Sequence, residues 1–182
     1  MGRPGFKPGG WRHALPGGFD SHSLPPSTPV RLPRGRFEVN VLGFDFPDAL
    51  HYHVEHQVWA RLDADGLVAV GITALGIRLS GEIYMCRPKS VGQVVEQGRS
   101  VAVVELAKAI VSVKSPLSGQ VVEVNDALAA APELVHLDPY GRGWLVRLQP
   151  SAWDAEREAL VHGDAVVAAM QHHAWLNNVE PL

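Results

Sequence analysis

The amino-acid sequence predicts a mainly β protein with helices at its C-terminal end. From residue 51 onward, short runs of β-branched residues are separated by Gly, Pro, Asp and Asn, which is typical of many short strands. The segment Gly-Gln-Val-Val-Glu occurs twice, at 92–96 and 119–123, and indicates two similar halves. After Pro150 the sequence becomes rich in Ala, Val, Leu and Glu, which favours helices. We therefore expect a two-halved barrel or sandwich followed by helices.

The first 36 residues differ in composition from the rest of the chain. They contain seven Pro, seven Gly and six basic residues against one acidic residue, Asp20. Such a segment cannot bury enough apolar surface to offset the entropy lost on ordering, so we expect a disordered basic tail at residues 1–36. It has no apolar core of signal-peptide length, and its prolines prevent the amphipathic helix of a mitochondrial presequence. Residues 37–50 are expected to connect the tail to the folded body.

Composition excludes several classes of protein. The chain of 182 residues is 46% hydrophobic and 19% charged, as in ordinary globular domains, and no run approaches the roughly 18 apolar residues of a membrane-spanning helix. The single cysteine, Cys86, cannot form an intrachain disulfide, which favours a reducing, cytoplasmic location. After the tail, ten basic residues stand against eighteen acidic ones. This net charge of −8 does not suit a nucleic-acid binder, so we expect neither nucleic-acid nor membrane partners.

The strands of the body can be placed from alternation and turn signals. The clearest pair lies between Val58 and Thr73, where apolar residues alternate with polar or small ones on both sides of Asp65-Gly66, a strong hairpin signal. Within residues 51–150, a helical pattern is expected only at Ala127–Val135. Further strands are expected at Gly81–Cys86, Val101–Leu106, Ala109–Val113, Gln120–Val124 and Trp144–Leu148.

Two helices are expected after Pro150, at Asp154–Val161 and Asp164–Leu176. Gly163 offers a break between them, and Asp164 is of a residue type that caps helix N-termini. The predicted organisation is therefore a tail, a connecting segment, a body and a helical extension. Their bounds are 1–36, 37–50, 51–150 and 151–182.

The repeat directs attention to one lysine. Two β units 27 residues apart are too few for a solenoid, so we expect the two copies to pair with each other. Their midpoint falls between Ala107 and Lys108, where two β-branched runs meet without Gly, Pro, Asn or Asp. We therefore expect Lys108 at a hairpin tip, open to water and to a partner enzyme, whereas Lys114 is interpreted as an ordinary solvated charge. Four residues are expected to pack on both faces of the hairpin: Val103, Val104, Ile110 and Val111.

Other chemistry-bearing residues indicate neither a catalytic set nor a metal site. The histidines concerned are His51, His53, His56, His172 and His173. The first three lie close in sequence around Glu55, but no further acid or cysteine at ligand spacing completes the cluster, so we interpret all five as structural. Nothing near Cys86 would stabilise a thiolate, so we expect it to be a small buried apolar residue. The sequence contains no Gly-x-Gly-x-x-Gly or P-loop motif.

The sequence around Lys108 resembles the lipoyl and biotinyl carrier domains, and most closely the H-protein of the glycine cleavage system and its H-like relatives. Those proteins modify a hairpin lysine three residues after a glutamate, followed by a proline-containing turn and a Gly-x-Val-Val-Glu-Val-Asn strand. Here Glu105-Leu106-Ala107-Lys108 has that spacing, and residues 115–125 supply the turn and strand. The resemblance covers about residues 51–150. It includes His56–Trp59, Val70–Thr73, Gly81–Ile83, Pro132–Val135 and Asp138–Leu145.

This resemblance implies a fold, a cofactor and partners. The fold would be the lipoyl-type barrel-sandwich hybrid of two pseudo-symmetric halves. Lys108 would carry lipoate in an amide bond, and Glu105 would be recognised by the modifying lipoyl ligase or transferase. The arm would carry an aminomethyl group from glycine decarboxylase to aminomethyltransferase, and dihydrolipoyl dehydrogenase would reoxidise it. The protein itself would be a non-catalytic carrier.

The sequence departs from the usual pattern of the family at three places. Leu106 stands where the family usually has serine, and residues 109–112 lack the acid often found after the lysine. Residues 85–89 are more basic than their usual equivalent. These departures leave two alternatives open, an H-like lipoyl carrier for sulfur oxidation or lipoyl relay, and an unmodified interaction module. Ala107 and Ala109 argue against biotin, whose carriers favour Met on both sides of the lysine.

Overall fold

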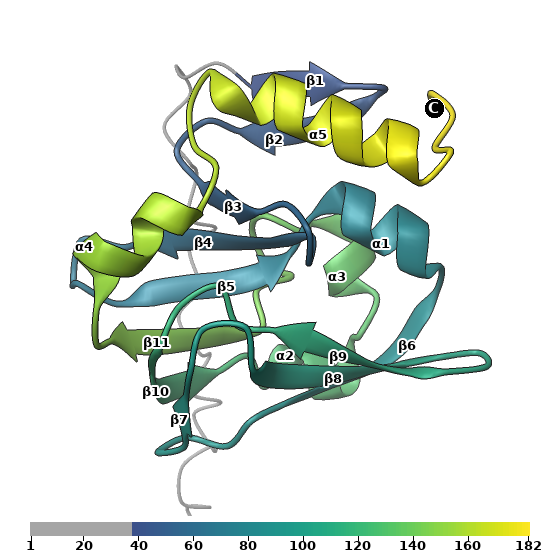
Figure 1. The fold of residues 1–182 in the computed structure, drawn as a ribbon. Coiled ribbons are helices and arrows are strands. Elements are labelled where there is room, and N and C mark those ends of the chain that lie inside the picture. Colours follow the sequence, from purple (N-terminus) through teal and green to yellow (C-terminus); the bar gives the residue numbers. More distant parts are fainter. Residues whose placement is uncertain (1–37) are drawn as a thin grey trace, which may run out of the picture. The chain divides into compact units, whose positions relative to one another are not determined.

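The computed structural model describes residues 38–182, a β-rich body with helices in its C-terminal part (Figure 1). The expected tail at residues 1–36 lies outside the described residues. In the described part, no helix is long and apolar enough to cross a membrane. The mainly β class and the C-terminal helix agree with the expectations from sequence.

The strands pair antiparallel and form three sheets. The largest has the order β3-β4-β5-β11-β10-β7, the second has the order β6-β8-β9, and β1 pairs with β2. The bounds of β1 to β5 are Glu38–Val41, Phe44–Pro47, His51–His53, Val58–Leu62 and Val68–Ile72. The bounds of β6 to β11 are Ile83–Pro88, Val94–Val95, Ser100–Leu106, Ile110–Lys114, Gly119–Val124 and Val146–Pro150. All strands expected between residues 51 and 150 are therefore present, displaced by at most two residues at either end.

The two copies of Gly-Gln-Val-Val-Glu lie side by side, as expected from the repeat. Within the pairing of β7 with β10, Gly119 lies opposite Val95. Val121 donates its N–H to the Gln93 carbonyl at 2.9 Å and accepts from Gly92 N–H at 2.7 Å. The repeated segments thus join at the edge of the largest sheet and leave the chain between them free to form a hairpin.

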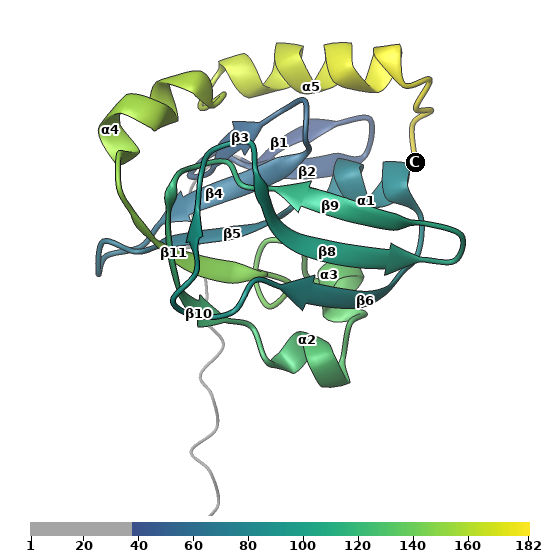
Figure 2. The same cartoon turned by 60° about the horizontal axis from the view of Figure 1, so that its bottom comes forward.

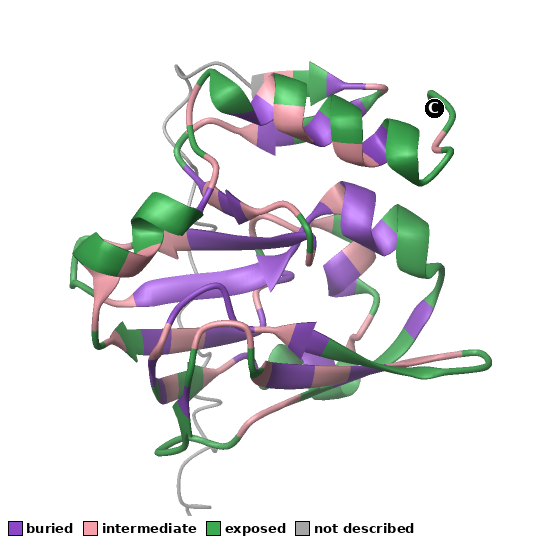
Figure 3. Cartoon of the chain, in the orientation of Figure 1, coloured by how far each residue is buried: buried purple, intermediate pink, exposed green. Residues whose placement is uncertain are grey.

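The main core consists largely of buried apolar residues of the six-stranded and three-stranded sheets, joined by residues of the helices and loops. The buried parts of these strands are purple in Figure 3. Val70, Val104 and Leu148 are each no more than 2% exposed. Cys86 belongs to this core, and burial raises the pKa of its thiol to about 11. The prediction that Cys86 is a buried apolar residue is confirmed, because a thiol with a raised pKa is mostly protonated and unreactive at neutral pH.

A second core lies against helix α5 (Ala165–Leu176) and the β1–β2 hairpin. The buried residues of α5 recur every four positions, at Val166, Met170 and Ala174, and so form one face of the helix. We expected residues 37–50 only to connect, but β1 and β2 occupy most of them. Phe44 and Phe46 alternate with polar neighbours and are both buried, which is the pattern of a half-buried strand.

Helix α1 (Ala74–Ser80) was not expected, so the prediction of a single helical pattern within residues 51–150 is wrong. Thr73 caps this helix, because its hydroxyl accepts a hydrogen bond from Gly76 N–H at 2.9 Å. Only seven residues long, α1 is too short to show a clear period in the sequence. Tertiary packing of the buried Leu75 and Ile77 side chains stabilises the helix.

The remaining helices are short and differ in detail from the expectations. The expected helix at 127–135 is divided into α2 (Ala127–Ala130) and α3 (Leu134–Leu137), because Pro132 disfavours helical conformation in the residue before it. The first C-terminal helix is α4 (Trp153–Glu156), followed by a 3-10 turn at 157–159. Asp164 precedes α5 as expected, but its side chain makes no capping hydrogen bond to the described residues.

Candidate functional site

The candidate site is the tip of the β8–β9 hairpin, which extends beyond the rest of the three-stranded sheet (Figures 1 and 2). Glu105 pairs with Ile110, and Leu106 N–H donates to the Ala109 carbonyl at 2.8 Å. These pairings leave Ala107 and Lys108 in the turn. The structure therefore places Lys108 at the position that the repeat predicted, at an exposed tip between two exposed alanines.

The base of the hairpin is held by the main core. Val101, Val104 and Val113 are buried, and β8 is hydrogen-bonded to β6 on one side and to β9 on the other. We expected packing on both faces, but Ile110 is 71% exposed and Val111 is 39% exposed. Ile110 and Val111 follow each other on β9 and point to opposite faces, so neither face of β9 is closed near the tip. β8 packs through the face of the buried Val104, and the opposite face, which carries Ile110, remains open beside the lysine.

Glu105 lies on that open face, three residues before Lys108. Its carboxylate forms an ion pair with the Arg87 guanidinium at 2.8 Å. The Arg87 Nε–H also lies 3.1 Å from the Met85 sulfur, so the arginine side chain is directed toward the hairpin tip. Met85 and Ile110 flank Glu105 on the neighbouring strands. A half-buried carboxylate, an exposed cation and two exposed apolar side chains therefore lie beneath the lysine.

Residues 38–182 contain three lysines. Of these, Lys108 is exposed, whereas Lys89 and Lys114 are half-buried. Lys114 lies at the far end of β9, opposite Ser100. It therefore lies at the base of the hairpin, where an enzyme that binds the tip would not reach it. A partner that must reach a lysine amine on this sheet would meet Lys108 first.

A small cavity of about 340 Å³ lies beside the hairpin tip. It is lined by Leu106 to Ala109, by Ser80 at the end of α1, and by Gly81 and Glu82, which follow the helix. Gly81 and Glu82 also line a larger cavity of about 780 Å³, which reaches Phe44 at the start of β2 and Tyr140. The segment that follows α1 therefore forms a wall shared by both cavities.

Three of the histidines singled out from the sequence stack on other histidine rings. His51 stacks on His162 with ring centroids 4.2 Å apart, and His53 stacks on His56 at 4.4 Å. Burial is the largest cause that lowers the pKa of His51, to about 4, and the nearby His162 adds to it. Among residues 38–182, no three or more His, Cys, Asp or Glu side chains are grouped so that they could hold a metal ion.

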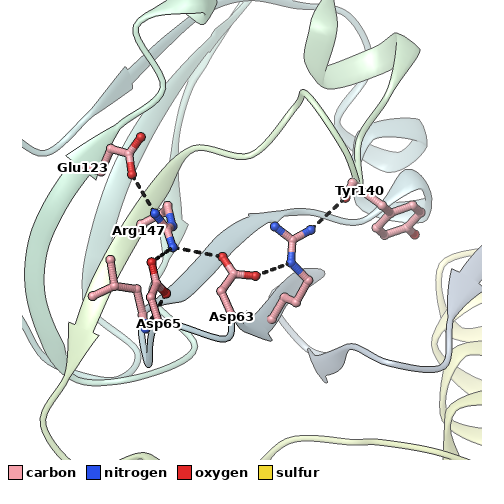
Figure 4. A network of polar contacts seen from close by, with 7 residues as sticks. Asp63, Asp65, Glu123, Tyr140 and Arg147 are labelled. Atoms are coloured by element: carbon pink, nitrogen blue, oxygen red, sulfur yellow. Dashed lines mark hydrogen bonds and ion pairs between the residues drawn. The ribbon is translucent and has the colours of Figure 1, made fainter. Parts of the chain in front are cut away.

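A network around Arg147 was not predicted from the sequence (Figure 4). Arg147 on β11 forms ion pairs with Glu123 at 2.9 Å, Asp65 at 2.6 Å and Asp63 at 3.3 Å. It therefore joins the turn after β4 to strands β10 and β11. Asp63 also pairs with Arg61, so each of the three carboxylates has a guanidinium partner within the body, and we interpret the network as structural.

Comparison with known proteins identifies the family. A model of the family described as glycine cleavage H-protein matches residues 50–173. The chain belongs to the glycine cleavage H-protein family. The matched segment contains most of α5, whereas β1 and β2 lie before it.

Individual H-proteins agree with this assignment. The chain is 36% identical to glycine cleavage system H protein 2 of Aquifex aeolicus over 131 residues, which cover 72% of this chain and 81% of that protein. It is 40% identical to the H protein of Cronobacter sakazakii over 125 residues, covering 69% and 95%. The crystal structure of an H protein from Mycobacterium marinum has a TM-score of 0.58 at 29% identity, covering 73% of this chain and 99% of that one.

Membership of the family settles three expectations. The expected lipoyl-type barrel-sandwich fold is confirmed by the solved H-protein structure. The protein is a lipoyl carrier of the H-protein family, and it is not an enzyme but a carrier component. The hairpin with Lys108 lies near the middle of the segment that the family shares.

Proposed function

We propose that Lys108 carries a lipoyl group and that the protein shuttles an aminomethyl group from glycine decarboxylase to aminomethyltransferase. Dihydrolipoyl dehydrogenase is the proposed partner that reoxidises the arm. The observation that carries this proposal is the exposed amine of Lys108 at the tip of a hairpin whose base is anchored in the core. A carrier needs this combination, because the arm must reach several enzymes from a fixed point.

The residues at the tip fit an amide-linked arm. Attachment forms a bond between Lys108 Nζ and the carboxyl carbon of an activated lipoyl donor. In passing from an ammonium to an amide N–H, Nζ loses two protons, and the activating group leaves with the electron pair of the broken bond. The methyl side chains of Ala107 and Ala109 leave the amine unobstructed. When bound, the lipoyl group supplies the dithiol redox and group-carrying chemistry.

Glu105 is the proposed contact for the modifying lipoyl ligase or transferase. Its side chain is 33% exposed on the open face of the hairpin, so its carboxylate is accessible to a cationic group of that enzyme. The net charge of −8 on residues 37–182 would steer the body toward basic docking faces on partner enzymes. The single, buried Cys86 is compatible with the proposed cytoplasmic location.

Intact mass of the protein from its source tests the attachment. We expect one lipoyl increment that is absent from a Lys108→Arg variant and kept in a Lys114→Arg variant. Lys114→Arg is the matched control because it changes the other lysine of the same hairpin. An increment that maps to Lys114 would contradict the assignment. An unmodified chain would favour an interaction module of the same fold.

The glycine cleavage role is tested with the lipoylated protein. With glycine decarboxylase from the same source, we expect glycine-dependent reduction of the arm, weakening as ionic strength rises because salt screens attraction beyond about 10 Å at 0.1 M. A standard H-protein serves as the positive control. If that control is reduced while this protein stays oxidised, the glycine cleavage role is wrong, and an H-like carrier for sulfur oxidation or lipoyl relay takes its place.

A further inference from the structure

A β-bulge controls which side chains of β6 face the same side as Glu105. The register between β6 and β8 shifts between Ile83 and Met85, so that Met85 lies opposite Glu105 and Arg87 lies opposite Val103. Side chains two positions apart on a strand point to the same face. Arg87 therefore shares the open face with Glu105. An unshifted register would have turned it to the opposite face.

On this face Arg87 is bound to the carboxylate that a modifying enzyme would need. Among the residues that the structure describes, Arg87 forms the ion pair with Glu105, and its guanidinium nitrogen lies 2.8 Å from the carboxylate oxygen. The arginine side chain is 63% exposed, so the pair is hydrated and each partner can be replaced without leaving a buried charge. An exposed ion pair of this kind is weak enough for a docking protein to displace.

The pair also changes the charge that the hairpin tip presents. Amide formation on Lys108 removes the positive charge of its amine. Glu105 alone would then leave the tip with one negative charge, whereas the Arg87–Glu105 pair is neutral. Arg87 thus weakens the electrostatic attraction between the Glu105 carboxylate and a cationic enzyme surface, both before and after modification.

We propose that Arg87 is a specificity residue of the hairpin, which competes with the modifying enzyme for the Glu105 carboxylate and thereby lowers the rate of Lys108 lipoylation. The inference rests on the proposed role of Lys108 and Glu105. Because the competition acts on encounter and binding, it raises the KM of the modifying enzyme for this chain and leaves kcat unchanged. A modifying enzyme that bears a carboxylate to meet Arg87 would be favoured over one that relies on Glu105 alone.

The test measures lipoylation of the purified unmodified chain by an ATP-dependent lipoate ligase, with lipoate and ATP, followed by intact mass. We expect Arg87→Gln to lower KM about twofold to fivefold with kcat unchanged, since that is the range by which an exposed ion pair shifts an equilibrium. Arg87→Lys keeps the cation and should behave like the parent chain. Raising the salt concentration should reduce the gain.

Two further variants show whether the effect passes through Glu105. Glu105→Gln should raise KM, and adding Arg87→Gln to it should bring no gain. Arg99→Gln is the matched charge control, because Arg99 forms an exposed pair with Glu96 beyond the other end of β8 and its removal should leave KM unchanged. An equal gain from Arg87→Gln with and without Glu105 would overturn the proposal.

The remaining outcomes separate this inference from the proposed function. If Lys108 is lipoylated in the parent chain and Arg87→Gln is modified no faster, Arg87 has no role in specificity and the lipoyl assignment stands. If neither chain is modified on Lys108, both proposals fail. If Arg87→Gln alone is modified, Arg87 excludes that ligase, which is the strongest form of the inference.

Discussion

At the scale of single residues, partial burial of the His51 ring makes the free energy of unfolding depend on pH. Its ring is stacked on His162 and lies 5.1 Å, edge to face, from Trp153. Burial is the main cause that lowers its pKa from 6.5 to about 4, and His162 and Arg157 add to the effect. The folded protein therefore holds His51 neutral in a pH range where the unfolded chain binds a proton.

We predict that the free energy of unfolding falls as the pH drops from about 6.5 toward about 4. The stability contribution of neutral His51 is complete above the unfolded pKa and is lost below it, because protons bind preferentially to the unfolded state. A His51→Phe variant keeps an aromatic ring beside His162 but cannot titrate, so its loss of stability on acidification should be smaller. Urea unfolding at about pH 7 and about pH 5 measures the difference.

Some pH dependence should remain in His51→Phe, because burial also lowers the pKa of His53 and of His173. Replacement of the exposed His172 by Gln provides the control, and it should follow the parent chain. An identical loss of stability in His51→Phe and the parent chain would show that the His51–His162 stack does not contribute.

At the scale of elements, one buried hydroxyl links α1 to the turn before β4. Thr73 is fully buried, accepts the hydrogen bond of Gly76 N–H, and donates to the Gln57 side-chain carbonyl at 2.5 Å. Gln57 is itself buried and its amide donates to the Val54 carbonyl at 2.7 Å. The cap of α1 and the turn before β4 are therefore one hydrogen-bonded unit.

Thr73→Ala should lower the free energy of unfolding by about 1–2 kcal/mol, because it removes the helix cap and leaves the buried Gln57 oxygen without its donor. Thr73→Ser keeps the hydroxyl and should lose much less. Denaturant midpoints at constant m-value compare the two variants. If the serine variant loses as much stability as the alanine variant, the lost methyl contact and not the hydrogen bond accounts for the effect.

At the scale of the whole molecule, the β1–β2 hairpin, which lies before the matched segment, and α5, most of which lies inside it, enclose a second core. Phe46 is fully buried and meets Tyr52 edge to face at 5.7 Å. The C-terminal Leu182 donates its N–H to the Leu42 carbonyl at 3.0 Å, which ties the end of the chain to the hairpin turn. Residues on both sides of the segment matched by the family therefore form one layer.

We predict that this layer, and not the first 36 residues, contributes to stability. Deletion of residues 1–36 should leave thermal unfolding and Lys108 modification unchanged, since their composition offers little apolar surface to bury. Phe46→Ala should cost about 3–5 kcal/mol, because it removes a fully buried aromatic ring. Scanning calorimetry of the two variants measures both effects. A clear drop in melting temperature on deletion of the tail would contradict the first expectation.

Local patterns in the sequence were enough to place most strands and Lys108. Alternating side chains record which way each residue points along a strand, and the pairing of the two repeat copies fixed Lys108 at the hairpin between them. Both features can be read from the order of residue types, the alternation within a few residues and the repeat between two segments 27 residues apart. The main β architecture and the candidate lysine could therefore be predicted from the sequence alone.

Helix α1, the β1–β2 hairpin and the Arg87–Glu105 pair depend instead on tertiary packing. Leu75 and Phe46 are stabilised by burial against residues far away in the sequence, which no local pattern records. Arg87 meets Glu105 because a bulge between Ile83 and Met85 shifts the register by one residue. Register is set by packing between strands, and a shift of one residue turns every following side chain to the other face.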